Sequence, residues 1–155
     1  MKLLLFFASA AALLPCCVFA QNSTEVFPRK EINAQIEALT QKGKTSGSSG
    51  TKLGDYQSHN ISLSVRSSSG GAEVHAHYDD VFVVTEGRAT LITGGTVIDG
   101  KTDSDGETKG PSIQNGKSQL IATGDVVHIP AGTPHQIKIA DGDVYGAIVI
   151  KVREP

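Results

Sequence analysis

Two histidine-bearing stretches that lie far apart in the sequence constrain this chain more than any other feature. The first, residues 74–87, carries His75 and His77, and the second, residues 124–136, carries His135. Side chains two residues apart in a β-strand point to the same face, so we expect His75 and His77 to project together. Two imidazoles on one face of a strand form a chelating pair.

The second stretch contains a turn directly before its last histidine. Pro130 fixes φ, and Gly132 permits a tight or left-handed conformation. The residues after this turn alternate, with His135, Ile137 and Ile139 on one face of a strand. Because His135 shares its face with two isoleucines, we predict that its imidazole points inward.

The rest of the chain is typical of an all-β domain. About eight to ten short strands follow one another up to Val152, with turn residues roughly every 8 to 12 positions, which indicates a sandwich or a barrel. In the first of them, residues 58–66, we expect the apolar face to be half-buried, with Ile61 and Leu63 shaping the pocket together with Phe82 and Ile137. His59 lies on the same face and would border the metal pocket or cap it.

The two stretches resemble the two motifs of the cupin superfamily, G-x5-H-x-H-x(3,4)-E-x6-G and G-x5-P-x-G-x2-H-x3-N. The second motif matches at Gly124, Pro130, Gly132 and His135, with Ile139 in place of its asparagine. The first matches at three positions and departs at two. The matching positions are His75, His77 and Gly87; Gly70 is one residue too close to His75, and Asp80 stands where the family has glutamate.

The resemblance implies a double-stranded β-helix, or jelly-roll, cupin barrel over residues 55–155, with a metal inside and one N-terminal helix outside. It also implies pairing into a homodimer. The implied metal ligands are His75, His77, His135 and Asp80. Asp79 is the alternative fourth ligand, and three histidines with water are another.

Three imidazoles and one carboxylate suit a divalent transition metal such as Mn, Fe, Co, Ni, Cu or Zn rather than Ca or Mg. On a six-coordinate ion these ligands leave two positions open, which metal catalysis requires. We therefore expect a metal-dependent oxygenase or isomerase acting on a small oxygen-rich molecule. The alternatives are a non-catalytic module that binds a metal or small ligand, and a structural domain with a vestigial site.

The N-terminal residues 1–20 have the features of a secretory signal peptide: Lys2, a short apolar run, and small residues before Gln21. A lipoprotein signal is the competing interpretation. Cleavage after Ala20 would remove both cysteines, Cys16 and Cys17, and would leave 13 basic against 16 acidic residues. We expect a secreted or periplasmic protein that binds neither nucleic acid nor, after cleavage, a membrane.

Two further segments have simple interpretations. In residues 21–54, Pro28 precedes a helical pattern of Ile32, Ile36 and Leu39, and the sequence from Lys42 onward predicts a flexible linker. Residues 101–118 are polar and predict a long loop, which could lie across a pocket mouth.

Overall fold

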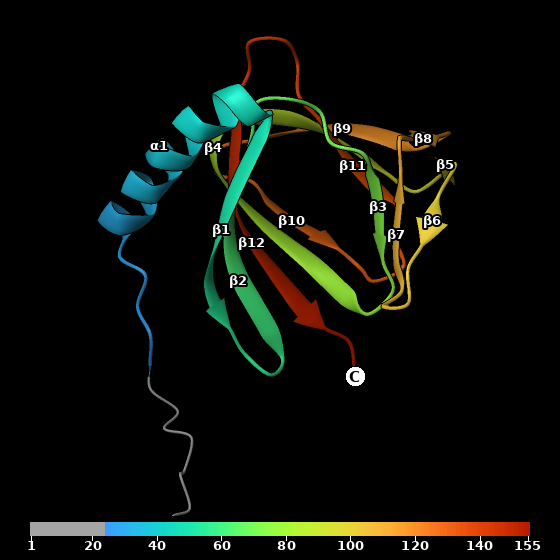
Figure 1. The fold of residues 1–155 in the computed structure, drawn as a ribbon, viewed down its shortest axis with the longest axis horizontal. Helices are drawn as coiled ribbons and strands as arrows, with labels where there is room; N and C mark the ends of the chain where they lie inside the picture. Colours follow the sequence, from blue (N-terminus) through green and yellow to red (C-terminus); the bar gives the residue numbers. More distant parts are fainter. Residues whose placement is uncertain (1–23) are drawn as a thin grey trace, which may run out of the picture.

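The computed structural model describes residues 24–155, which form one helix followed by twelve strands (Figure 1). The elements, in chain order, are α1 (Arg29–Ser46), β1 (Ser48–Asp55), β2 (His59–Arg66), β3 (Ala72–His75), β4 (Tyr78–Thr93), β5 (Thr96–Ile98), β6 (Lys101–Thr102), β7 (Glu107–Gly110), β8 (Ser112–Gln114), β9 (Lys117–Ala122), β10 (Val126–Ile129), β11 (His135–Lys138) and β12 (Tyr145–Arg153). The predicted all-β class is confirmed.

The strands form two facing layers that share the long strand β4. Residues 78–87 of β4 pair with β12, and residues 88–93 pair with β9, so one strand passes from the first layer to the second. All pairings are antiparallel, in the order β1-β2-β12-β4-β11-β3-β7-β6, while β9 and β10 also pair with β4. The double sheet is not closed: β1 and β6 end this order, and β9 and β10 each pair with β4 alone. The short strands β5 and β8 form a separate two-stranded antiparallel sheet.

Gly87 lies where β4 changes layers, and only glycine fits there. Its φ is +65°, in the left-handed region that L side chains rarely adopt. A Cβ atom at this position would lie 1.8 Å from the carbonyl oxygen of Val144. These two backbone segments can approach so closely only because residue 87 has no side chain.

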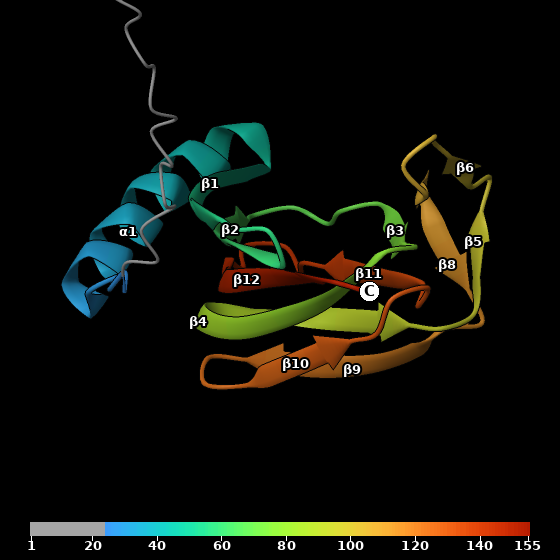
Figure 2. The same ribbon diagram turned by 90° about the horizontal axis from the view of Figure 1, so that it is seen from below.

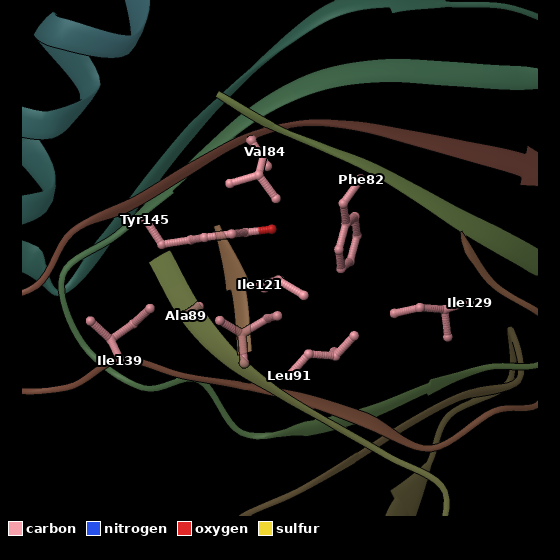
Figure 3. Close-up of a cluster of buried hydrophobic side chains, with 10 residues drawn as sticks. Phe82, Val84, Ala89, Leu91, Ile121, Ile129, Ile139 and Tyr145 are labelled. Atoms are coloured by element: carbon pink, nitrogen blue, oxygen red, sulfur yellow. The ribbon is translucent and has the colours of Figure 1, made fainter. Parts of the chain in front are cut away.

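The main hydrophobic core fills the space between the two layers (Figure 3). Phe82 and Val84 enter it from the first half of β4, and Ala89 and Leu91 from the second half. Alternate residues of each half are buried, as expected for strands with one face on a core. The other members are Ile121, Ile129, Ile137, Ile139, Tyr145 and Ala147.

A second core lies outside the barrel, where α1 packs on β2. Ile32 and Ile36 of the helix contact Leu63 and Val65 of the strand, and all four are buried. Figures 1 and 2 show α1 on the outer side of β1 and β2. The helix outside the barrel is as predicted, but the predicted role of Ile61 and Leu63 in the pocket is wrong, because this face of β2 is turned toward the helix.

Two segments expected to be irregular are ordered. Residues 42–46 continue α1, and residues 48–55 form the edge strand β1, so the predicted linker is wrong. Residues 101–118 contribute β6, β7, β8 and the start of β9 instead of a loop. These small strands lie at the end of the barrel away from α1 (Figure 2).

The proposed signal segment, residues 1–20, lies outside the described residues. Within residues 24–155, no helix is both long enough and apolar enough to span a membrane.

The Gly87→Ala variant should lower the free energy of unfolding in urea by about 3 kcal/mol or more, because it adds a backbone clash to left-handed strain. Gly132→Ala is the matched control. Gly132 has a similar φ of +75°, but nothing lies within 4 Å of a Cβ built there. It should lose only about 1 kcal/mol, and equal losses in the two variants would contradict the clash at Gly87.

Candidate metal centre

The two histidine-bearing stretches lie together, as predicted. A backbone hydrogen bond joins them. The N–H group of Gly132 donates to the carbonyl oxygen of His75 over 2.8 Å, which ties the turn to the end of β3. Gly132 has the left-handed conformation expected from the sequence. The ring centroids of His75 and His135 lie 5.0 Å apart, and both side chains are buried.

Two carboxylates face these two imidazoles. One ligand atom each from Glu73, His75 and His135 forms a group whose members all lie within 4.8 Å of one another. Asp80 Oδ2 lies 3.3 Å from Nε2 of His75 and 3.5 Å from Nε2 of His135. Lys151 binds the other oxygen of this carboxylate, with Nζ 2.9 Å from Oδ1, and so leaves Oδ2 facing the histidines.

Hydrogen bonds to Nδ1 fix the orientation of both imidazoles. Nδ1 of His135 lies 3.0 Å from the carbonyl oxygen of Thr133, which can only accept, so this nitrogen carries the proton. Nδ1 of His75 is bonded to the carboxylate of Glu107 on β7. Such partners are typical of metal-binding histidines, because they direct the Nε2 lone pair toward the ion. Nε2 of His75 is buried and has no hydrogen bond of good geometry within residues 24–155.

The pKa values of these groups reflect burial against close charges. Burial lowers the pKa of His135 below its usual value. Burial also acts to lower the pKa of His75, but Asp80 and Glu107 outweigh it, and the net pKa is raised. Burial acts to raise the pKa of Asp80, yet contacts with His75 and Lys151 hold it below its usual value.

His77 does not join this cluster, which corrects the prediction that it shares a face with His75. The strand β3 ends at His75, and Ala76 and His77 form a bend that leads into β4. The bend breaks the two-residue alternation, and the His77 side chain is exposed. Glu73, two residues before His75 in the same strand, takes the place on the shared face.

The other candidates of the sequence lie outside the cluster. Asp79 accepts hydrogen bonds from the N–H group of Ala131 and from Nε2 of His128, at 2.7 Å and 3.0 Å. It therefore joins β4 to the turn after β10, while Asp80 points inward. His59 stacks on Tyr56 near the start of β2.

A cavity of about 220 Å³ lies between the layers beside the cluster. Glu73, Asp80 and Lys151 line it together with the buried phenol of Tyr145. Burial raises the pKa of Tyr145, so the phenol keeps its proton at neutral pH and can donate a hydrogen bond. The polar face of β2 also lines the cavity, with Ser62, Ser64 and Arg66.

The donor set fits a divalent transition metal, because imidazole and carboxylate ligands together suit ions of this class. Sequence reasoning missed Glu107, Lys151 and Arg66, and did not place Glu73 among the metal ligands. The position of Glu73 could have been predicted, because a residue two positions from His75 in a strand lies on the same face. No local pattern indicates that Glu107 pairs with His75, because β3 and β7 are distant in sequence.

Comparisons with known proteins support the fold. The protein TT1209 from Thermus thermophilus matches with a TM-score of 0.55 and 16% identity, over 77% of this chain and 95% of the other. The polyketide cyclase RemF from Streptomyces resistomycificus, which has a cupin-type fold, matches with a TM-score of 0.51 and 18% identity, over 70% of this chain and 68% of the other.

The DMSP lyase DddQ from Ruegeria pomeroyi DSS-3 also matches, with a TM-score of 0.51 and 15% identity. The match covers 70% of this chain and about half, 48%, of the lyase chain. Neither the protein-family models nor the curated protein sequences gave a match.

The Asp79→Asn variant should lower the urea midpoint of unfolding but leave the metal content unchanged, because Asp79 joins β4 to a turn and does not face the cluster. Metal content is measured by elemental analysis, and stability by equilibrium unfolding. Loss of metal in a variant that remains folded would identify Asp79 as a ligand.

Proposed function

The protein has a cupin fold, and from this premise we propose that it is a metal-dependent enzyme acting on a small oxygen-rich molecule. His75, His135 and Glu73 would hold a divalent transition metal, with Asp80 as the fourth ligand. Four protein ligands on a six-coordinate ion leave two adjacent or opposed positions for a bound molecule.

One observation carries the proposal: two imidazoles with their Nδ1 atoms already bonded direct Nε2 toward two carboxylates in a buried space. A neutral imidazole presents a lone pair at Nε2, and a lone pair facing a carboxylate is repulsive. A cation between these atoms removes the repulsion and satisfies all four groups. Buried polar groups without partners are otherwise costly.

The reaction type that fits best is Lewis-acid chemistry assisted by hydrogen-bond donors. When bound, the metal would polarise an oxygen atom of the substrate. The Tyr145 hydroxyl and the Lys151 ammonium line the same cavity and can donate hydrogen bonds to a molecule there. Two structural neighbours are named as a lyase and a cyclase, which agrees with non-oxidative chemistry on a cupin scaffold.

A metal-free binding module is the second candidate, and the ion pair between Lys151 and Asp80 favours it. In that case Lys151 and a protonated His75 would balance Asp80 and Glu73 without an ion. Secretion, based on residues 1–20, and pairing into a homodimer stay predictions.

His135→Ala should abolish retention of metal in protein purified without chelator, because it removes one of two imidazole ligands. His77→Ala is the matched control and should keep the wild-type content, since its side chain is exposed outside the cluster. Elemental analysis gives the metal per chain in each preparation.

Wild-type metal content in His135→Ala, or its loss in His77→Ala, would show that the ion is held elsewhere. Wild-type protein that carries no metal and takes none up on titration would favour the binding module. A screen of the metal-loaded protein for oxygen uptake with small diols, phenols and organic acids separates the two reaction types. Metal-dependent oxygen consumption would overturn the Lewis-acid proposal in favour of an oxygenase.

A further inference from the structure

The cavity beside the metal centre contains an arginine that forms no ion pair or side-chain hydrogen bond with the described part of the chain. Arg66 is half-buried at the end of β2 and lines the cavity. None of the ion pairs formed within residues 24–155 includes it, and neither does any side-chain hydrogen bond of the same residues. A guanidinium that is partly withdrawn from water and unpaired lacks the anion that this group normally binds.

The guanidinium of Arg66 lies close to the turn that joins β2 to β3. It lies against Gly70, where a Cβ atom would come within 2.7 Å of Nη1 and 3.1 Å of Cζ. Arg66, Glu73 and Asp80 line the same cavity of about 220 Å³, which is large enough for a small molecule.

A second polar group without a partner lies next to Arg66. Tyr145 is the Cα partner of Arg66 in the pairing of β12 with β2, so the two side chains leave the sheet side by side on the cavity face. Tyr145 is only 3% exposed, and its hydroxyl has no hydrogen-bond partner within residues 24–155. Figure 3 shows the ring of Tyr145 directed between the layers, with its hydroxyl toward Phe82.

The charges of the cavity also favour an anion. Glu73 and Asp80 on the cavity wall and Glu107 on His75 carry three negative charges, and Arg66 and Lys151 carry two positive charges. A divalent cation at the metal centre therefore leaves a surplus of one positive charge. A buried surplus of this kind is stabilised by a negatively charged ligand.

We propose that the cavity binds its substrate as a small organic carboxylate, with the carboxylate held by the guanidinium of Arg66 and the hydroxyl of Tyr145. One guanidinium presents one planar fork, which matches a carboxylate, and the phenol adds a third donor. Phe82, Ile137 and Val149 line the same cavity and contact the apolar body of the molecule. This inference names the substrate class of the proposed enzyme and rests on that function.

Benzoate and benzamide are the probes, because they share one shape and differ in charge. Binding is measured by NMR titration on the zinc-loaded protein, which keeps the charge balance of the cavity, and Arg66→Gln separates the contribution of the arginine from that of the metal. Wild-type protein should bind benzoate at least tenfold more tightly than benzamide. Arg66→Gln should weaken benzoate binding roughly tenfold to hundredfold, since a hydrogen-bonded charge is lost, and leave benzamide binding unchanged.

Three further variants sharpen the result. Arg66→Lys should recover part of the affinity, and Tyr145→Phe should lose several-fold, because one donor is missing. Arg29→Gln, an exposed arginine at the start of α1, is the matched control and should bind benzoate as the wild type does. Thermal unfolding and the metal content after reloading identify variants that have lost the fold or the metal centre.

Equal affinity of the wild type for benzoate and benzamide would overturn the inference, and so would unchanged benzoate binding in Arg66→Gln. Tighter binding of inorganic phosphate than of benzoate would also overturn it, since the site would then recognise a different anion. If these tests fail while the wild type retains metal, the proposed metal-dependent function still stands. If the wild type retains no metal but discriminates benzoate from benzamide, the proposed function fails and the anion site remains.

Discussion

The structure depends on four polar groups that converge between the layers, three of them buried and Glu73 partly exposed. The Nε2 atoms of His75 and His135 face the carboxylates of Asp80 and Glu73. With Nδ1 of each ring already bonded, these nitrogens can bind only a proton or a cation. The barrel therefore places nitrogen lone pairs opposite carboxylate oxygens, which repel each other. A positive charge between these groups is needed to stabilise the arrangement.

The fold supplies this arrangement through contacts between distant segments. The hydrogen bond from Gly132 to His75 joins the turn before β11 to the end of β3, and β7 brings Glu107 to the outer nitrogen of His75. Lys151 on β12 occupies one oxygen of Asp80 and directs the other toward the rings. Each partner lies on a different strand, so the site exists only when both layers of the barrel are assembled.

The sequence predicted the parts of this site that follow from local rules. The inward direction of His135 followed from its alternation with Ile137 and Ile139, and the turn at Gly132 from the backbone freedom of glycine. The pairing of His75 with His77 was wrong because alternation holds only within a strand, and β3 ends at His75. Where a strand ends depends on its neighbours, here β7 and β11, which no local pattern shows.

The same limit explains β2, whose two faces were assigned in reverse. Its apolar face was expected to line the pocket, but α1 covers that face from outside, and Ser62, Ser64 and Arg66 line the cavity. Alternation separates the faces of a strand but does not tell which face meets the barrel interior when a helix covers the other. Alternation placed Ser62, Ser64 and Arg66 on one face of β2, but it did not indicate that this face lines the cavity.

The central claim, that one cation lies between the two imidazoles, is tested most directly by anomalous diffraction from crystals of the metal-loaded protein, measured on both sides of the metal absorption edge. The account predicts a single strong peak about 2.0 to 2.2 Å from Nε2 of both His75 and His135. A peak at His77 or at the pair of Asp79 and His128, with none between the buried rings, would contradict it.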